Sequence, residues 1–283
     1  MAEPDEVENV EEDEELPAWS MRRDDPRANT LRSGLPPGID RDWAWGGSTG
    51  AGVPVAVVDS GIDADHEFVR GVQRAAHVEF SEEGEPFVVE AGVGDRAGHG
   101  TACAGIIRSL APDCVLWDVC VLGTEMRGNY AALVEGVSWA VEQGARVVNL
   151  SLSSSKARAA ELLHLVSDDA YFKNAVLVAS AHNLEVRSYP WQFASVVSVA
   201  SHEGDDPMEF LFNPEPPVEL FARGMNVEVA WLGGSKIVAA GNSFATAHVT
   251  GVCALILAKH PELTPFQVKS VLYATATNTG AAA

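Results

Sequence analysis

Ser243 is the residue of this chain whose type and setting most clearly suggest chemistry. It stands between a glycine turn and a small-residue, apolar run, 249–258, which is typical of a loop-to-helix junction. A hydroxyl at such a junction is exposed and lies at the positive end of a helix dipole. Both properties suit a nucleophile, although serine is also a favoured N-cap residue. The nucleophile interpretation therefore needs a base, an orienting acid and an oxyanion donor elsewhere in the chain.

An aspartate and a histidine occupy settings that match. Asp59 ends the short apolar run 55–58, which is typical of a buried parallel strand whose carboxyl end meets a ligand site. His99 precedes the small and apolar stretch 102–107 and is expected to begin a buried helix. Together with Ser243, these residues have the types that a catalytic triad needs. Taken singly, Asp59 would be a turn residue, His99 a helix terminus and Ser243 an N-cap.

The three residues lie in short motifs that resemble those of the subtilisin-like serine peptidases, the subtilases. The chain order, aspartate then histidine then serine, is also the order of that family. The resemblance covers residues 43–275 and implies an α/β, three-layer subtilisin-like fold, with a mostly parallel central sheet and helices on both faces. It further implies a serine endopeptidase that works through an acyl-enzyme. The motifs are Asp59-Ser60-Gly61-Ile62-Asp63, His99-Gly100-Thr101 and Gly241-Asn242-Ser243-Phe244-Ala245.

The resemblance also implies the remaining parts of the site. Asn183 matches the asparagine that stabilises the oxyanion, with the backbone N–H of Ser243 as its partner. Two backbone segments are expected to flank the substrate and pair with it as strands. Tyr130 matches the rim of the P4 pocket, or else is an ordinary helix-packing residue. The substrate-binding residues implied in this way are Gly128, Tyr130, Ser151, Leu152, Ser153, Ser180 and His182.

Several residues depart from the family pattern. Ser153 and His182 stand where the family has glycine, so we expect a narrower or more polar P1 pocket than in broad-specificity relatives. Asn242 replaces a threonine before Ser243, and its amide is a second candidate oxyanion donor. Phe68 stands where a carboxylate ligand would be expected, which predicts that the calcium site found in many relatives is missing. We expect no metal and no cofactor.

The elements that must position these residues follow from the hydrophobic pattern. From residue 53 it alternates between strands and helices, which predicts a parallel sheet with right-handed crossovers. Thr264 and Pro265 mark a helix start, because threonine favours the N-cap and proline the first turn. Residues 204–217 are rich in loop formers and lead to a late strand at 218–221. Strands are expected at 53–59, 114–122, 146–150, 175–179 and 196–200, and helices at 99–109, 129–143, 157–172, 243–259 and 265–273.

The composition limits the partners. The chain has 283 residues, 47% of them hydrophobic, which is enough for one sizeable core. Its 40 acidic and 19 basic residues give a net charge of −21, which argues against nucleic-acid binding. No apolar segment is long enough to span a membrane, so we expect no membrane partner. The partner that the resemblance implies is a peptide or protein substrate. The four cysteines lie in apolar settings without metal-ligand spacing, which indicates reduced, buried thiols.

The N-terminal stretch differs from the rest of the chain. Residues 1–41 form an acidic, proline-dotted leader that is expected to be disordered, and residues 42–283 form the subtilisin-like peptidase domain. The leader lacks the basic region and the apolar core of a secretory signal. That composition predicts a cytoplasmic protein.

Two functions are compatible with the sequence. The first is a serine endopeptidase that carries out limited processing of an intracellular peptide or protein precursor, favoured by the narrowed pocket and the cytoplasmic setting. The alternative is a catalytically silent or tail-inhibited subtilase-like protein that binds peptides through the same cleft. The complete triad argues against the silent alternative. The oligomeric state stays open.

Overall fold

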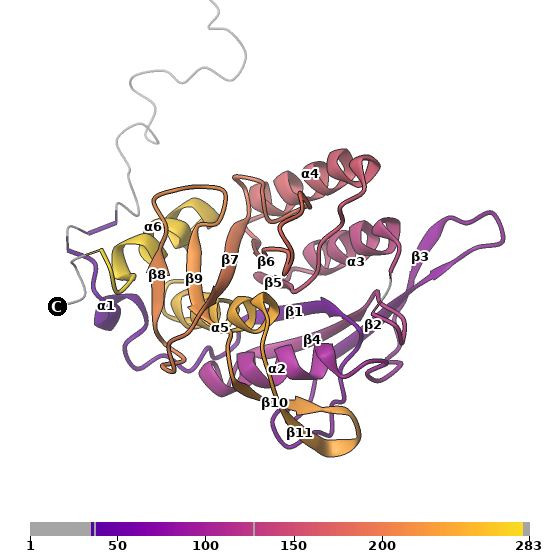
Figure 1. The fold of residues 1–283 in the computed structure, drawn as a ribbon, viewed down its shortest axis with the longest axis horizontal. Coiled ribbons are helices and arrows are strands. Elements are labelled where there is room, and N and C mark those ends of the chain that lie inside the picture. The colour runs from indigo at the N-terminus through magenta and orange to yellow at the C-terminus, as the bar shows by residue number, and fades with distance from the viewer. Residues whose placement is uncertain (1–34, 37, 127, 280–283) are drawn as a thin grey trace, which may run out of the picture. The chain divides into compact units, whose positions relative to one another are not determined.

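The structure of the chain is a computed structural model, which describes residues 35, 36, 38–126 and 128–279. The chain divides into two units, Met1–Leu35 and Pro36–Ala283. Residues 1–34, most of the expected acidic leader, lie outside the described residues. The second unit carries the α/β fold (Figure 1).

A nine-stranded sheet forms the centre of the second unit. The strands are β1 (Pro54–Asp59), β2 (Arg74–Phe80), β3 (Pro86–Val89), β4 (Val115–Cys120), β5 (Val147–Leu150), β6 (Val176–Ser180), β7 (Val197–His202), β8 (Phe210–Phe212) and β9 (Leu220–Arg223). Their order is β3-β2-β4-β1-β5-β6-β7-β9-β8, and only the two edge pairs, β2 with β3 and β8 with β9, are antiparallel. β10 (Val227–Trp231) and β11 (Ser235–Ala239) form a separate hairpin. The carboxyl ends of β1, β5 and β6 therefore meet near the middle of one sheet edge.

Helices cover both faces of this sheet. They are α1 (Arg41–Trp45), α2 (His99–Leu110), α3 (Tyr130–Glu142), α4 (Ala157–Phe172), α5 (Asn242–Lys259) and α6 (Pro265–Thr275). α2 and α5 pack against each other on one face, where α5 also contacts β5, β6 and β7. α3 and α4 lie side by side on the other face, as Figure 1 shows. The prediction of a mostly parallel sheet between two helical layers is confirmed.

The apolar core has a layer on each side of the sheet, because strand side chains alternate between the two faces. Ala56 and Val58 of β1 belong to the layer that includes α3 and α4, and their neighbours Val55 and Val57 are also fully buried. Burial on both faces explains why β1 is a continuous apolar run. α5 is buried on nearly all sides, as its small and apolar residues require. Even so, none of the helices within the described ranges is long and apolar enough to cross a membrane.

The predicted elements agree with the structure to within a few residues. α4 covers the predicted range residue for residue, and Thr264 caps α6 by accepting a hydrogen bond from the Gln267 N–H. β8 lies inside 204–217, so the prediction of loop is wrong for Phe210–Phe212. A three-residue strand carries too little pattern to stand out from the turn residues around it.

Asp118 is a buried carboxylate on β4. It is 2% exposed, and its Oδ1 has no hydrogen-bond partner among the described residues. Burial raises the pKa of Asp118 to about 7, and the nearby carboxylates of Asp95 and Asp59 add to the rise. In the unfolded chain the pKa returns to about 3.8. Between these two pH values the unfolded state ionises while the folded state stays protonated, so Asp118 increasingly destabilises the fold as pH rises.

We predict that Asp118→Asn stabilises the protein relative to the wild type by an amount that increases as pH rises from 4 to 7. The reason is that asparagine does not ionise in the unfolded chain, whereas Asp118 does. The free energy of unfolding of the variant minus that of the wild type should rise by up to about 4 kcal/mol between pH 4 and pH 7. Above pH 7 this difference should stay constant. Chemical denaturation at several pH values measures this difference. The exposed Asp65→Asn serves as the control. A difference for Asp118→Asn that does not change with pH would contradict the explanation.

Candidate active site

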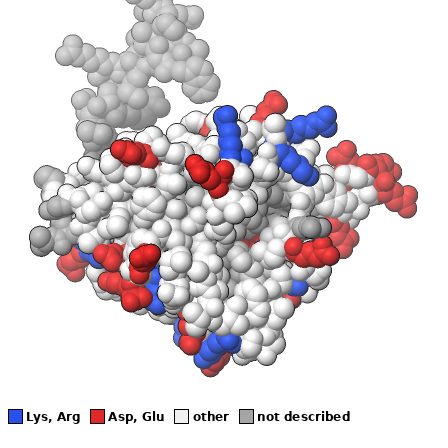
Figure 2. Space-filling model, viewed as in Figure 1, with Lys and Arg blue, Asp and Glu red and all other residues white. Residues whose placement is uncertain are grey.

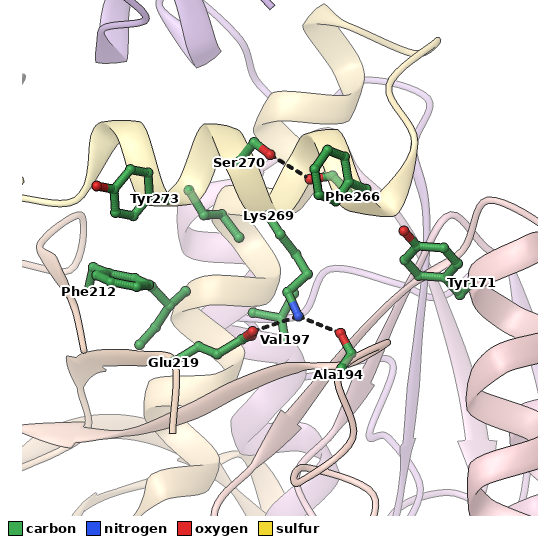
Figure 3. A pocket seen from close by; sticks show the side chains of 11 residues that line it. Tyr171, Ala194, Val197, Phe212, Glu219, Phe266, Lys269, Ser270 and Tyr273 are labelled. Atoms are coloured by element: carbon green, nitrogen blue, oxygen red, sulfur yellow. Dashed lines mark hydrogen bonds and ion pairs between the residues drawn. The ribbon is translucent and has the colours of Figure 1, made fainter. Parts of the chain in front are cut away.

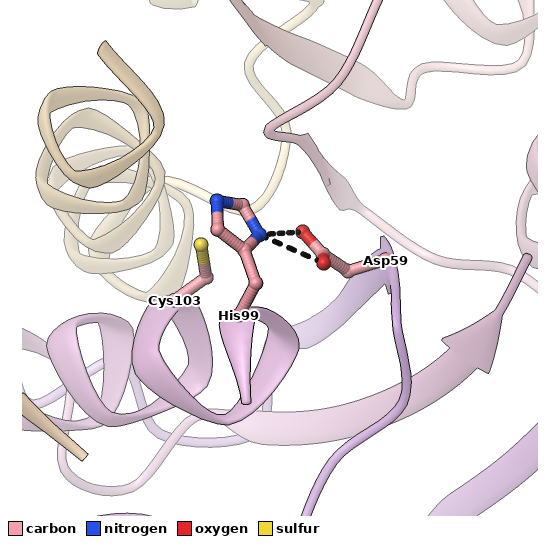
Figure 4. A group of neighbouring side chains, drawn as sticks. All are labelled: Asp59, His99 and Cys103. Atoms are coloured by element: carbon pink, nitrogen blue, oxygen red, sulfur yellow. Dashed lines mark hydrogen bonds and ion pairs between the residues drawn. The ribbon is translucent and has the colours of Figure 1, made fainter. Parts of the chain in front are cut away.

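Asp59 and His99 form a hydrogen-bonded pair at the carboxyl end of β1 (Figure 4). Asp59 is the last residue of β1 and is fully buried, and His99 is the first residue of α2. His99 Nδ1 lies 2.8 Å from Oδ1 and 2.9 Å from Oδ2 of Asp59. Because a carboxylate accepts, Nδ1 carries the proton and Nε2 is left as the basic nitrogen. The pair has the geometry of a general base with its orienting acid.

Two glycines let α2 begin against the end of β1. Gly98, the N-cap of α2, has a φ of 91°, a left-handed conformation that favours glycine. Gly100 passes so close to the turn after Asp59 that a Cβ there would lie 2.1 Å from the carbonyl oxygen of Gly61. The sequence Gly-His-Gly is therefore a steric requirement for placing His99 beside Asp59.

Asp95 ties the loop before α2 to the turn after β1, a role that sequence reasoning missed. Its Oδ1 accepts from Ser60 Oγ at 2.8 Å and from the Gly98 N–H at 2.7 Å. Its Oδ2 accepts from the Thr101 N–H at 2.9 Å, within the first turn of α2. A carboxylate at this end of a helix is also favoured by the helix dipole. Asp95 therefore positions His99, and an acidic residue one turn before that histidine was the available signal.

The charge of Asp59 controls the pKa of His99. Burial alone would lower the pKa of His99, because burial penalises the charged imidazolium. The attraction of the Asp59 carboxylate and its hydrogen bond outweigh burial, so the pKa of His99 is raised above its ordinary value of 6.5. Asp59 thus both orients the imidazole and stabilises its protonated form.

Ser243 lies in the first turn of α5 and lines the same groove as His99. Ser243 is 7% exposed, and its Oγ donates to the Ser151 carbonyl oxygen at 3.2 Å. In return, Ser151 Oγ donates to the Ser243 carbonyl oxygen at 3.1 Å. The groove has a volume of about 690 Å³. The structure therefore brings the predicted nucleophile and the predicted base into one cavity.

Asn183 lines the groove with its amide held in one orientation. Its Oδ1 accepts from the Asn242 N–H at 3.0 Å, which leaves Nδ2 as the donor for a ligand. The side chain of Asn242 is used elsewhere. Its Nδ2 donates to the Ala181 carbonyl oxygen at 3.1 Å, and its Oδ1 accepts from the Ser201 N–H at 2.9 Å. The prediction of Asn242 as a second oxyanion donor is therefore wrong, because its amide braces the loop that carries Asn183.

The groove also gathers every residue that the sequence predicts for substrate binding. Ser151 follows β5 and Ser180 ends β6, at the sheet edge where α/β proteins bind ligands. Tyr130 lines the groove and also packs against the core, so its place in the P4 pocket stays a prediction. The predicted residues on the groove walls are Gly128, Tyr130, Ser151, Leu152, Ser153, Ser180 and His182.

The groove wall at Ser153 is fixed by hydrogen bonds that sequence reasoning missed. Ser153 Oγ lies 3.0 Å from Oγ of the fully buried Ser188, which also accepts from Trp191 Nε1 at 2.8 Å. His182 adds a partly exposed imidazole to the same groove. Ser153 and His182 therefore occupy space that glycines would leave open. Ser153 and Ser188 are 35 positions apart in the chain, so no local pattern predicts their contact.

A buried polar network holds Ser151 against Ser243. Asn149 Nδ2 donates to Ser151 Oγ at 3.0 Å, and Thr250 Oγ1 donates to Asn149 Oδ1 at 3.0 Å. Cys103 Sγ lies 3.4 Å from the same Ser151 hydroxyl. Burial raises the pKa of the Cys103 thiol well above its ordinary value, so this thiol stays protonated. These supporting roles were missed, although an asparagine inside an apolar strand was a signal for a buried polar contact.

The potential metal ligands do not have the arrangement of a metal site. Among the residues that the structure describes, Asp59, His99 and Cys103 form the one group whose ligand atoms all lie within 4.8 Å of one another. Figure 4 shows the Cys103 thiol on the other side of the imidazole from Asp59, which is already bonded to His99. At the position expected for a calcium ligand, Phe68 lies under Lys236, whose Nζ is 4.3 Å from the ring centroid. A ring and an ammonium group do not fit a cation that needs oxygen ligands.

A second cavity, of about 410 Å³, lies beside α6 and shares no lining residue with the groove (Figure 3). Lys269 Nζ donates to the Ala194 carbonyl oxygen at 2.7 Å and pairs with the Glu219 carboxylate at 2.7 Å. Phe212 and Tyr273 supply aromatic walls. The charged groups of this cavity are therefore engaged in structural contacts, which makes the groove the better candidate for an active site.

Comparison with known proteins identifies the family. A sequence profile of the subtilase family matches residues 50–283. The chain belongs to the subtilase family. Subtilisin DY of Bacillus licheniformis is 32% identical to it over 249 residues, covering 83% of this chain and 87% of that protein. The alkaline protease of Alkalihalobacillus alcalophilus is 31% identical over 294 residues, covering 98% of this chain and 73% of that protein.

Solved structures agree with this family. The subtilase matches a cold adapted subtilisin-like serine proteinase with a TM-score of 0.65 and 26% identity, over 82% of this chain and 87% of that chain. It shares the fold of Sphericase, with a TM-score of 0.68 and 24% identity, over 85% of this chain and 89% of that chain. This subtilase is a serine endopeptidase with a subtilisin-like fold.

We predict that Asp59→Asn lowers the pKa of His99. The variant loses the carboxylate that raises the pKa, while the burial that lowers it remains. An NMR titration of the His99 ring protons measures the change. Asp205→Asn, at an exposed loop position, is the control and should leave the titration of His99 unchanged. An unchanged His99 titration in Asp59→Asn would contradict control by Asp59.

Proposed function

We propose that Asp59, His99 and Ser243 are the catalytic triad of this subtilase. Ser243 Oγ turns from the Ser151 carbonyl oxygen toward His99 Nε2 and attacks the scissile carbonyl carbon while His99 takes its proton. His99 then gives this proton to the leaving amine, and water releases the acyl group by the same route. Asp59 stabilises the imidazolium in both steps. The observation that carries the proposal is the 2.8 Å bond from His99 Nδ1 to Asp59, beside the groove that Ser243 lines.

The developing oxyanion needs donors that are aimed in advance. We propose that Asn183 Nδ2 and the backbone N–H of Ser243 supply them. The hydrogen bond from the Asn242 N–H to Asn183 Oδ1 supports this role, because it fixes which end of the amide faces the groove. The substrate would lie as an added strand between the segment at Tyr130 and the segment 151–153.

We propose a limited processing role on a peptide or protein precursor in the cytoplasm. The side chains of Ser153 and His182 on the groove wall support a restricted substrate range. The four cysteines are free and buried, which supports a reducing compartment. The sequence places the border between leader and peptidase domain at residue 41, but α1 begins at Arg41 and the second unit at Pro36. We therefore propose that the acidic leader ends near residue 35 and that the peptidase domain follows it.

Covalent labelling tests the triad. We expect a fluorophosphonate probe, which reacts with activated serine nucleophiles, to label the wild type and to leave folded Ser243→Ala unlabelled. Circular dichroism checks the fold of the variant. If the folded wild type resists the probe, the test is repeated after deletion of residues 1–34. Labelling restored by the deletion would favour the tail-inhibited alternative, and continued resistance would favour a catalytically silent protein.

We predict that Asn183→Ala lowers kcat by about 10²–10³-fold and leaves KM nearly unchanged, the loss known for the equivalent change in subtilisin. The reason is that the lost donor acts on charge that appears only in the transition state. Steady-state hydrolysis of a chromogenic peptide measures both constants. Leu184→Ala, at the exposed neighbouring position, is the matched control. A loss confined to KM would show that Asn183 binds the ground state instead.

A further inference from the structure

The groove of this acidic subtilase has no acidic residue among the described residues that line it. These are apolar, hydroxyl, amide and imidazole groups, with Lys156 as the one lysine or arginine. The whole chain, by contrast, has 40 acidic and 19 basic residues. The triad carboxylate, Asp59, is fully buried and bonded to His99. The groove is therefore a local exception to the charge of the molecule.

Lys156 also differs from the other four lysines of the chain. Lys173, Lys236 and Lys269 form ion pairs with carboxylates at 2.9, 2.6 and 2.7 Å. Lys259 donates to two backbone carbonyl oxygens. Lys156 is exposed and pairs with no carboxylate in the part of the chain that the structure describes. Its positive charge is therefore available to a ligand in the groove.

The position of Lys156 places this charge at the groove rim. Its Nζ lies 5.9 Å from the ring centroid of Tyr130, which forms part of the wall. Lys156 is the N-cap of α4, where its ammonium group cannot accept a hydrogen bond from the first N–H groups of the helix and so has no capping role.

A second cation lies on the neighbouring segment of the chain. Ser154 and Tyr189 pair as an antiparallel bridge. Lys156 follows Ser154 by two residues, and Arg187 precedes Tyr189 by two residues. Because the two segments run antiparallel, both cations lie on the same side of the bridge. Arg187 is exposed, with its guanidinium 5.7 Å from the Tyr189 ring centroid. In Figure 2 some basic side chains stand on the upper part of this face, near the place of α4 in Figure 1, and others lie at its lower end.

We propose that this groove selects peptides that present a carboxylate side chain to Lys156, with Arg187 as a supporting cation. The inference rests on the proposed function, since the peptide must lie along the same groove. Tyr130 matches the rim of the P4 pocket in subtilases, so the selected residue is four positions before the scissile bond. A glutamate there gains an ion pair that its uncharged isostere glutamine lacks. For a partly exposed pair, the gain is about fivefold in kcat/KM.

Internally quenched peptides test this preference. Three peptide libraries carry Glu, Gln or Lys at P4, alanine at P1 and mixed residues elsewhere, and are assayed in about 0.15 M salt to screen long-range charge effects. The wild type should cleave the Glu library about fivefold faster than the Gln library and the Lys library more slowly still. Lys156→Glu should reverse this order. Lys173→Gln, at the far end of α4, is the control and should behave as the wild type.

The outcomes separate this inference from the proposed function. Reversal in Lys156→Glu supports a direct contact, because a general loss of folding would slow all three libraries alike. If the wild type reacts with the fluorophosphonate probe and cleaves the Glu and Gln libraries equally, the acid preference is overturned and the triad stands. If the wild type neither reacts with the probe nor cleaves any library, with or without residues 1–34, both proposals are overturned.

Discussion

The hydrogen bond between Asp59 and His99 is the contact on which the rest of the site depends. A fully buried carboxylate is costly unless it is paired and hydrogen-bonded. Asp59 meets this condition through His99 Nδ1 and the Ser60 N–H, which donates to its Oδ1 at 2.8 Å. Both donors come from segments that must be correctly placed against β1. The carboxylate of Asp59 thus connects the end of β1, the turn after it and the start of α2.

The second half of the site depends on how α2 and α5 pack. His99 begins one helix and Ser243 lies in the first turn of the other, and the two helices pack against each other on the same face of the sheet. The mutual hydrogen bonds of Ser151 and Ser243 then connect α5 to the end of β5. Groups placed on packed elements are held more accurately than groups on loops. The Ser243 hydroxyl and the His99 imidazole are therefore positioned by helices that pack in the core rather than by surface loops.

The proposed triad residues stand out in the sequence, whereas most of the groups that hold them in place do not. Asp59, His99 and Ser243 each interrupt or flank an apolar run, so their polarity stands out locally. A local signal marks Asp95 and Asn149 as unusual but does not reveal their partners. Asp95 bonds to Ser60, 35 positions away, and Asn149 to Thr250, 101 positions away. The same limit explains the wrong prediction for Asn242. The direction of an amide is decided by the carbonyl groups that the fold brings to it.

The charge of this subtilase acts differently at long and at short range. A net charge of −21 repels an acidic substrate as a whole. At physiological ionic strength, that field is largely screened beyond about 8 Å. At shorter range a bound peptide meets the ammonium group of Lys156 on groove walls that no described acidic residue lines. The net charge therefore disfavours the approach of an acidic peptide, whereas the proposed contact with Lys156 favours it once it is bound. Any preference for acidic peptides must then arise from contacts in the groove and not from the rate of association.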